Sequence, residues 1–515
     1  MLLPGSIDPD IGLLLPAVQK ATGGGDPSPT TRLPEIASVD EISIGGNPSA
    51  LAGVEPDEID IAFDADTDIL IGVQPAAIDD FKALLPPPND QTWSQDTPGI
   101  KYDSEAYDFF GQAVTTGDFN GDGYADLVVG APGESVGVSN PIEDAGAVNV
   151  IYGSASGLVP NGPPLNDQVW TQNSTGLNAG FGAETGDAFG ASVMAGDFNG
   201  DGYTDLAVGA PNEDVNSTNN AGAVNIIYGS ANGLTATDSQ FWTQDSAGID
   251  AGFGAEAGDN FGKAMTAGDF NGDGYVDLAI GAPGEDVFDI ADAGAVNVLY
   301  GSANGLTAVG DQMWHQNSGQ AQASPVLSSA AEAGDSFGAS LTSGDFDGDG
   351  IDDLAIGSPS ESVGNIGSAG AATVIYGSAN RLTATGHQTW HQDSAGILDE
   401  AEQGDRFSAS LTAGDFNDDG IDDLAVGVYS EDIADIAHAG AVNVIYGSSN
   451  RLSATGDQFW SQNSAGIQGN SEYGDYFGWS LTSGDFDGDG IDDLGVGVPL
   501  EQSDSSSTNA GAVNI

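Results

Sequence analysis

Apolar residues along this chain fall into short runs that Gly, Pro, Asn and Asp interrupt. The runs are rich in β-branched and aromatic residues, which favour strands, whereas the residues between them favour turns. One such run is Val224–Tyr228, which has Asn225 as its single polar residue and lies between Gly222 and Gly229. The pattern therefore predicts an all-β chain of short strands joined by tight turns.

The runs form a repeated unit with four pieces in a fixed order. In the second copy the pieces are Phe189–Val193, Asp205–Pro211, Ala221–Ser230 and Gln240–Asp245. Four short strands per unit, repeated with Gly and aromatic markers, are typical of a β-propeller blade. A β-solenoid is the alternative, but its repeats are usually much shorter than these, which recur every 70–79 residues. We therefore predict a β-propeller of six four-stranded blades.

An acidic loop of nine residues joins the first piece to the second in every unit. Its pattern is Asp-Phe-Asn/Asp-Gly/Asp-Asp-Gly-Tyr/Ile-x-Asp, so side-chain oxygens recur at positions 1, 3, 5 and 9, and Gly recurs at position 6. Ca²⁺ binds six to eight oxygens at about 2.3–2.6 Å, and a short acidic loop can wrap around it. The six copies are Asp118–Asp126, Asp197–Asp205, Asp269–Asp277, Asp345–Asp353, Asp415–Asp423 and Asp485–Asp493.

These loops predict about six calcium sites, one between the first and second strands of each blade. We expect the side chains at positions 1, 3, 5 and 9 and the backbone carbonyl at position 7 to supply the oxygens. An EF-hand would need a Glu at position 12 and flanking helices, but position 12 is apolar here and the flanks have strand patterns. Because carboxylates held in one loop repel each other, bound Ca²⁺ should stabilise the fold. The expected ligands are Asp118, Asn120, Asp122, Tyr124, Asp126, Asp197, Asn199, Asp201, Tyr203, Asp205, Asp269, Asn271, Asp273, Tyr275, Asp277, Asp345, Asp347, Asp349, Ile351, Asp353, Asp415, Asn417, Asp419, Ile421, Asp423, Asp485, Asp487, Asp489, Ile491 and Asp493.

The charge of the chain excludes some classes of binding partner. It has 78 Asp and Glu against 8 Lys and Arg, a formal net charge of -70, and no Cys. Such a surface repels nucleic acid and anionic membranes, so neither is expected as a partner. No run of about 20 apolar residues is present that would insert this chain into a membrane. The lack of Cys excludes disulfides and thiol chemistry.

The two ends of the repeat region indicate how a ring could close. The fourth piece occurs first around Trp93, ahead of the first complete loop, whereas the last unit stops at Ile515 without its own copy. We expect residues 89–96 to add the outer strand to the last blade, so that residues 90–515 form a closed propeller. If the chain is truncated at Ile515, six blades are a lower bound and seven are the alternative.

Residues 1–89 differ in composition from the repeats. They are rich in Pro, Gly and acidic residues, and we expect them to be largely irregular. Within them, Asp60–Gly72 faintly resembles the acidic loop and the strand that follows it. Met1–Lys20 lacks the basic start and the sustained apolar core of a signal peptide, so either export is signalled elsewhere or the sequence is a fragment of a longer chain.

These motifs together resemble the FG-GAP repeat of the N-terminal propeller of integrin alpha chains. The fifth unit departs from it with Phe407-Ser408 and Gly427-Val428-Tyr429. The resemblance implies seven blades, adhesion or ligand binding outside the cell, and Ca²⁺ loops on the face opposite the ligand surface. Phe-Gly precedes the loop at 110–111, 189–190, 261–262, 337–338 and 477–478, and Gly-Ala-Pro follows it at 130–132, 209–211 and 281–283.

Nothing in the sequence indicates an enzyme. The four His residues are scattered, and no nucleophile elbow, zinc-protease motif or phosphate-binding loop occurs. We therefore expect an extracellular, calcium-binding adhesion or ligand-binding module, whose ligand is a protein or glycan of the cell surface or matrix. Two alternatives remain, a lectin-like glycan-binding propeller and the non-catalytic propeller of a secreted hydrolase. The repeated Trp could stack on sugars, but packing between blades is the stronger expectation.

Overall fold

The computed structural model describes residues 59–63, 69–73 and 91–515, apart from 138–140, 161–164, 179, 250–252, 319–326, 328–329 and 503–509. The chain divides into two compact units, Met1–Trp93 and Ser94–Ile515. In the first unit, residues 59–63 and 69–73 form one antiparallel hairpin of β1 (Ile59–Phe63) and β2 (Ile69–Val73). The rest of the segment 1–89, which the sequence predicts to be largely irregular, lies outside the described residues.

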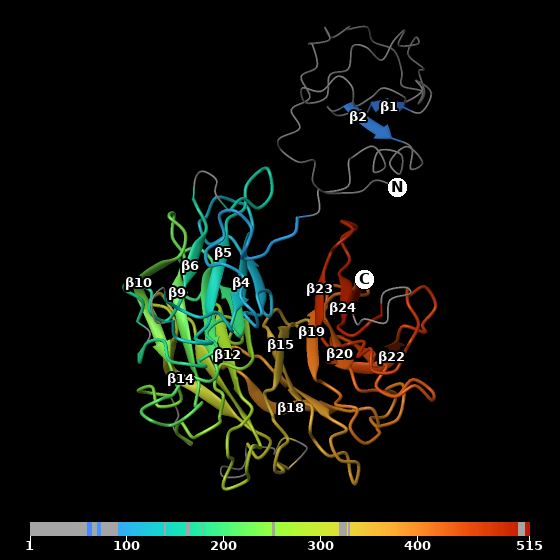
Figure 1. Cartoon of the computed structure of the whole chain (residues 1–515). Coiled ribbons are helices and arrows are strands. Elements are labelled where there is room, and N and C mark those ends of the chain that lie inside the picture. Colours follow the sequence, from blue (N-terminus) through green and yellow to red (C-terminus); the bar gives the residue numbers. More distant parts are fainter. Residues whose placement is uncertain are drawn as a thin grey trace, which may run out of the picture. The chain divides into compact units, whose positions relative to one another are not determined.

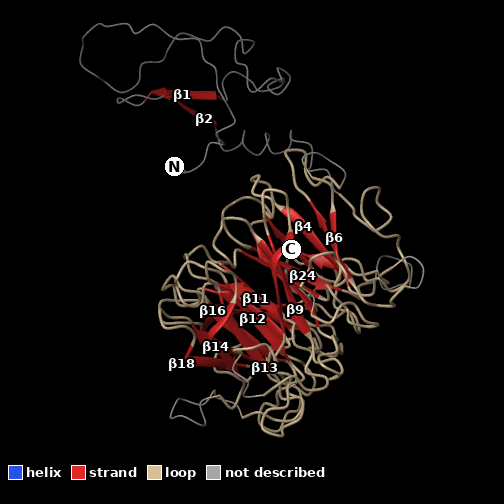
Figure 2. Cartoon of the chain, turned by 90° about the vertical axis from the view of Figure 1, so that its left-hand side faces the viewer, coloured by secondary structure: helices blue, strands red, loops and turns tan. Residues whose placement is uncertain are grey.

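The second unit is built from six antiparallel sheets that follow one another in sequence order around a common centre (Figure 1). Five of these sheets have four strands and the last has three. Strands are the only regular elements that the described residues form, and none of these residues is helical (Figure 2). This arrangement confirms the predicted all-β propeller, with one sheet for each repeat.

Within a four-stranded sheet, the strands lie side by side in chain order. The first strand of each sheet also contacts the first strand of the next sheet, from β3 to β23, so these strands line the centre. The sheets are β3 (Val114–Gly117), β4 (Asp126–Ala131), β5 (Ala147–Ile151) and β6 (Gln168–Trp170); β7 (Ser192–Gly196), β8 (Asp205–Ala210), β9 (Ala223–Tyr228) and β10 (Thr235–Trp242); β11 (Met265–Gly268), β12 (Asp277–Ala282), β13 (Ala295–Tyr300) and β14 (Thr307–Trp314); β15 (Ser340–Gly344), β16 (Asp353–Ser358), β17 (Ala371–Tyr376) and β18 (Thr383–Trp390); β19 (Ser410–Gly414), β20 (Asp423–Val428), β21 (Ala441–Tyr446) and β22 (Ser453–Trp460); and β23 (Leu481–Gly484), β24 (Asp493–Val498) and β25 (Ala512–Asn514).

The second and third strands of a sheet are buried on both faces. Every residue of β8 and β9 is buried, because each sheet packs between two neighbouring sheets. A strand covered on both faces needs apolar side chains at successive positions rather than at alternate ones. This explains why these strands are mostly apolar in the sequence, with Asp205 in β8 and Asn225 in β9 as the polar exceptions.

The hydrophobic core consists of separate clusters, each lying between two consecutive sheets. The cluster between the first two sheets contains Phe119 and Trp170 from the first and Phe189 and Leu206 from the second. Trp170 is buried there, which agrees with a packing role for the repeated Trp. Each sheet therefore depends on its neighbours for most of its apolar burial.

The ends of the sheet series differ from its middle. The last sheet holds β23, β24 and β25, and the described residues 91–96 contain no strand. The expected pairing of residues 89–96 with the last sheet therefore stays a prediction. Among the described residues there is no helix with the length and apolar character needed to cross a membrane.

Candidate metal centres and a buried acidic pair at the sheet junctions

Each predicted calcium loop lies where the sequence places it, between the first and second strands of its sheet. The loop Asp197–Asp205, for example, begins directly after β7 and its last residue opens β8. Because all six loops occupy the same place in their sheets, they lie at the same end of the propeller.

Backbone N–H groups hold the loop carboxylates in a compact turn. In the second loop, Asp197 Oδ1 accepts from Gly200 at 2.7 Å and its Oδ2 accepts from Gly202 at 2.9 Å. The side-chain oxygen of Asn199 accepts from Asp201 at 2.8 Å, and Asp201 Oδ1 accepts from Tyr203 at 3.0 Å. Glycine at position 6 is required here, since Gly202 has a φ of 89°.

The Asp at position 9 is the most deeply placed of the predicted ligands. Asp205 is fully buried, its Oδ2 accepts from the backbone N–H of Phe198 at 3.0 Å, and its Oδ1 accepts from Gly229 at 2.9 Å. One carboxylate thus connects the start of the loop, the start of β8 and the end of β9.

The fourth and sixth loops bring three carboxylates together as a cation would require. One oxygen from each of Asp345, Asp347 and Asp353 lies within 4.8 Å of the other two. The same holds for Asp485, Asp487 and Asp493, which occupy the same positions 1, 3 and 9 in the sixth loop. The Asp at position 5 is not part of either group.

The electrostatics of these loops fit a hard divalent cation. Burial, followed by the charges of Asp347 and Asp345, raises the pKa of Asp353 to about 8. The Oδ1 atom of Asp347 is buried and has no hydrogen-bond partner. Clustered carboxylates with an unpartnered oxygen are an oxygen-only donor set that Ca²⁺ would satisfy, while its charge would offset their repulsion.

The loops are also joined to one another, which sequence reasoning missed. The backbone carbonyl of Asp345, the first residue of the fourth loop, accepts from the N–H of Asp422 in the fifth loop at 3.1 Å. In return, Asp422 Oδ2 accepts from the N–H of Asp345 at 2.9 Å. The sequence signal for this contact between loops was the Ile-Asp-Asp run that the last three loops share. The backbone bond recurs in Thr204 to Asp118, Val276 to Asp197, Asp352 to Asp269 and Asp492 to Asp415.

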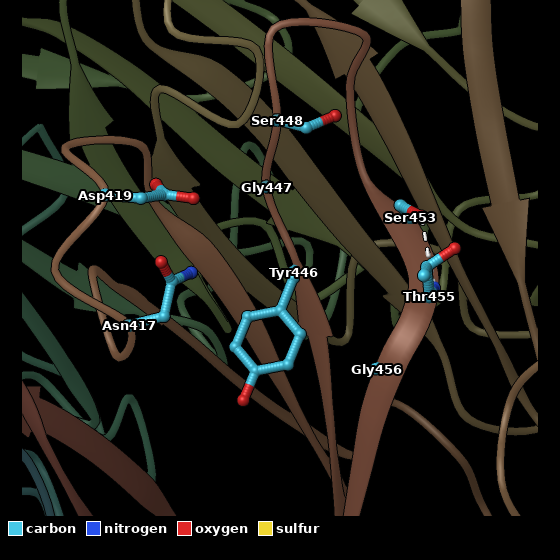
Figure 3. A pocket seen from close by; sticks show the side chains of 8 residues that line it. All are labelled: Asn417, Asp419, Tyr446, Gly447, Ser448, Ser453, Thr455 and Gly456. Carbon is cyan, nitrogen blue, oxygen red and sulfur yellow. Dashed lines mark hydrogen bonds between the residues drawn. The ribbon is translucent and has the colours of Figure 1, made fainter.

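A shallow hollow of about 390 Å³ lies beside the fifth loop (Figure 3). Asn417 and Asp419 of that loop lie on one side, and Tyr446 forms part of its wall. In the preceding sheet the equivalent Tyr376 is covered by the guanidinium of Arg451, 4.3 Å from the ring centre. The hollow lies beside Tyr446 because the neighbouring sheet, which has three strands, leaves that ring uncovered.

A second set of acidic residues lies buried at the junctions between sheets, and it too was absent from the sequence prediction. At the junction of the first two sheets, Gln172 Nε2 donates to Glu213 Oε2, and Asp187 Oδ2 accepts from the N–H of Glu184. The Gln and the Glu are 41 residues apart. The same Gln-to-Glu bond occurs for Gln95 and Glu134, Gln244 and Glu285, Gln316 and Glu361, Gln392 and Glu431, and Gln462 and Glu501.

Burial makes these junction carboxyls weak acids. It raises the pKa of Glu213 to about 8, and the charge of Asp187 adds to the rise. Burial likewise raises the pKa of Asp187 to about 6. The sequence signal was available in the fixed Glu two residues after Gly-Ala-Pro and in the Asp two residues before Phe-Gly.

The family model described as FG-GAP repeat matches six segments of the chain. The matched segments coincide with the first three strands of each sheet and the loop between the first two. They are residues 110–151, 189–226, 261–299, 337–375, 407–445 and 477–513.

Curated relatives match only part of the chain. Phosphatidylinositol-glycan-specific phospholipase D of Bos taurus is 36% identical over 183 residues, which are 35% of this chain and 19% of the relative. Integrin alpha-PS5 of Drosophila melanogaster is 34% identical over 184 residues, 36% of this chain and 16% of the relative. Integrin alpha pat-2 of Caenorhabditis elegans is 31% identical over 281 residues, 51% of this chain and 19% of the relative. The matched part is thus less than a fifth of each relative.

Among solved structures, a rhamnogalacturonan lyase, YesW, aligns with a TM-score of 0.33 and 13% identity, covering 72% of this chain and 71% of that chain. A TM-score this low carries no argument about function. The repeats, the sheets and the relatives agree, and the chain is an FG-GAP repeat protein whose six repeats resemble the propeller of integrin alpha chains.

Proposed function

We propose that this chain is a calcium-stabilised propeller that works outside the cell as an adhesion or protein-ligand-binding module, without catalysis of its own. The observation that carries the proposal is the set of repeated acidic loops. Their carboxylates converge at positions 1, 3 and 9 in the fourth and sixth loops, and the loops are joined by backbone hydrogen bonds. A cation in one loop would therefore also support the next sheet junction.

The alternative of a glycan-binding propeller shares the same scaffold. The non-catalytic part of a secreted hydrolase is favoured by a specific observation, because several relatives are named as a phospholipase D. In both alternatives, as in our proposal, the propeller binds and positions a partner, and calcium stabilises the scaffold.

Thermal unfolding with Ca²⁺ and with EGTA, at several NaCl concentrations, tests the calcium part of the proposal. Metal that binds only the folded state stabilises it by RT ln(1 + [L]/Kd), which is about 2.7 kcal/mol for one site at a hundredfold excess over Kd. We expect a large rise of the midpoint in Ca²⁺ that NaCl does not reproduce. Equal stabilisation by NaCl or Mg²⁺ would mean that the loops are generic acidic turns, and would remove the chemical basis of the proposal.

A further inference from the structure

Five aromatic rings form a continuous cluster where the fifth and sixth sheets meet. The ring centres of Tyr429 and Trp479 are 4.7 Å apart, and Tyr476 lies 5.7 Å from the first and 5.9 Å from the second. His438 lies 6.1 Å from Tyr476 and 6.3 Å from Tyr473. We call these five residues the aromatic patch.

The patch is open to solvent although it is made of large rings. Trp479 is 51% exposed and Tyr473 is 77% exposed. Tyr429, His438 and Tyr476 are half-buried. Soluble domains rarely expose adjoining aromatic side chains unless the surface binds something.

The repeats show that the fold does not require these rings. The position of Trp479 is Ala in three other sheets, and the position of Tyr429 is Pro at the four preceding junctions. A side chain that the same fold replaces by Ala or Pro elsewhere is not needed for the scaffold. The equivalents of Trp479 are Ala191, Ala339 and Ala409, and those of Tyr429 are Pro132, Pro211, Pro283 and Pro359.

One of the rings also occupies an unfavourable backbone position. Tyr476 has a φ of 59°, in the left-handed region that bulky side chains seldom adopt. The same position carries Ala, Asn and Ser in the second, third and fourth sheets. Placing a bulky ring there works against local preference, as expected where a surface is shaped for binding.

Two neighbouring loops carry the patch, and backbone bonds hold these loops together. Tyr476 N–H donates to the carbonyl of His438 at 3.2 Å, and Gly474 N–H donates to that of Ala437 at 3.2 Å. Tyr429 follows the end of β20, and Trp479 precedes the start of β23. Both are thus at the end of the sheets opposite the acidic loops.

The charge around the patch is negative. Asp432, Asp435 and Glu472 are exposed on the same two loops, and Asp432 Oδ1 accepts from the N–H of His438 at 2.9 Å. Residues 429–438 and 472–479 include no Lys or Arg. Aromatic faces attract cations, and nearby carboxylates add to that attraction.

We infer that the aromatic patch is a docking site for a polypeptide segment that presents Arg or Lys side chains. The cationic groups stack on Trp479 and Tyr473 and pair with the exposed carboxylates of the two loops. The inference deepens the proposed function and rests on it, since it names the surface and the partner class of the binding module.

Fluorescence anisotropy with a labelled dodecapeptide of alternating Arg and Gly, in Ca²⁺ and at 0.15 and 0.5 M NaCl, tests this site. The test variants are Trp479→Ala and Tyr473→Ala, which install residues that other repeats carry, Ala339 and Ala333. At the higher salt, we expect each variant to bind about 3- to 30-fold more weakly, the range of one desolvated cation–π contact. The peptide with Gln in place of Arg should not bind.

Phe288→Ala is the matched control, because Phe288 is 60% exposed and lies in the sequence between Asp286 and Asp289. Binding to this control should stay within twofold of wild type. Equal affinity of all variants, with loss of binding at high salt, would mean diffuse attraction to the acidic surface and would overturn the inference. Binding of neutral oligosaccharides that depends on Trp479 while the Arg peptide does not bind would overturn it in favour of a glycan site.

The two proposals fail in different ways. If the Arg peptide does not depend on the patch while Ca²⁺ still raises the unfolding midpoint, only the docking inference is wrong. If Ca²⁺ has no specific effect on the midpoint, the calcium-stabilised scaffold itself is wrong, whatever the peptide does.

Discussion

Asp205 joins three parts of its sheet through one carboxylate, so its replacement tests the loop at the scale of a single residue. Asp205→Asn keeps the size but removes one acceptor, which leaves the N–H of Phe198 or Gly229 without a partner. Leaving a buried N–H without a hydrogen-bond partner costs about 1–3 kcal/mol of stability. We expect that decrease in the free energy of unfolding from urea titration in Ca²⁺, and one fewer bound ion by elemental analysis.

The control for that prediction is Asp238→Asn, a substitution outside the loops at an exposed Asp of β10. It should leave stability and ion count unchanged. Loss of stability in Asp205→Asn with the full number of ions retained would show that position 9 is a structural acceptor and not a ligand.

The raised pKa of Glu213 predicts how the free energy of unfolding depends on pH. Its folded pKa is raised to about 8, above the usual value of about 4.3 for an unfolded chain. The native state therefore holds its proton more tightly, and the stability contributed by the neutral form is complete below about pH 4 and is lost as pH rises towards 8. In saturating Ca²⁺, we expect Glu213→Gln to lose less stability than wild type between pH 5 and 8.

Glu400→Gln serves as the comparison, because Glu400 is exposed and is not one of the Glu residues that pair with a junction Gln. Thermal midpoints measured at each pH should give it the same pH slope as wild type. A slope for Glu213→Gln that is also unchanged would show that the Glu213 carboxyl is not held neutral in the folded protein.

At the scale of the sheet, replacing the Phe at position 2 of a loop tests how much the stability of one sheet depends on packing against the next. Phe198 is 0% exposed in the cluster between the second and third sheets, whereas Phe486 of the last sheet is 50% exposed. Truncating a buried Phe costs about 3–5 kcal/mol, and a surface change is usually within about 0.5 kcal/mol. We expect urea unfolding to show that difference between Phe198→Ala and Phe486→Ala. Comparable losses would mean that Phe486 is covered in solution.

The sheets were predictable from sequence because each one repeats the same local signals. A run such as Val224–Tyr228 is apolar apart from Asn225 and is bounded by Gly, and a strand buried on both faces needs that pattern. The acidic loops were predictable for a similar reason, since four oxygen positions and a Gly fit within nine consecutive residues.

The parts that sequence reasoning missed are contacts across sheet junctions. Gln172 and Glu213 are 41 residues apart, and each alone resembles an ordinary surface residue. Asp422 bonds to Asp345 of the preceding loop, so its role depends on how two sheets pack rather than on its own loop. The aromatic patch was missed for the same reason, because Tyr429 and Trp479 meet only across a junction.

At the scale of the whole molecule, the two ends of the sheet series are the least covered. In β24 three of six residues are only half-buried, whereas all six residues of β16 are buried. The first strand β3 has no buried residue, while β11 has three. Local opening is easiest where the fewest apolar groups are buried, so the ends should open more readily than the middle.

Native-state hydrogen exchange in saturating Ca²⁺ measures that gradient directly. We expect β3, β23 and β24 to exchange fastest and β12, β13, β16 and β17 to exchange slowest, because the middle sheets are covered on both faces. EGTA should raise exchange in all sheets together, since backbone bonds join each loop to the next. Protection of β24 equal to that of β16 would contradict the gradient. It would mean that an additional strand or sheet covers the last sheet in solution, as the predicted pairing of residues 89–96 would do.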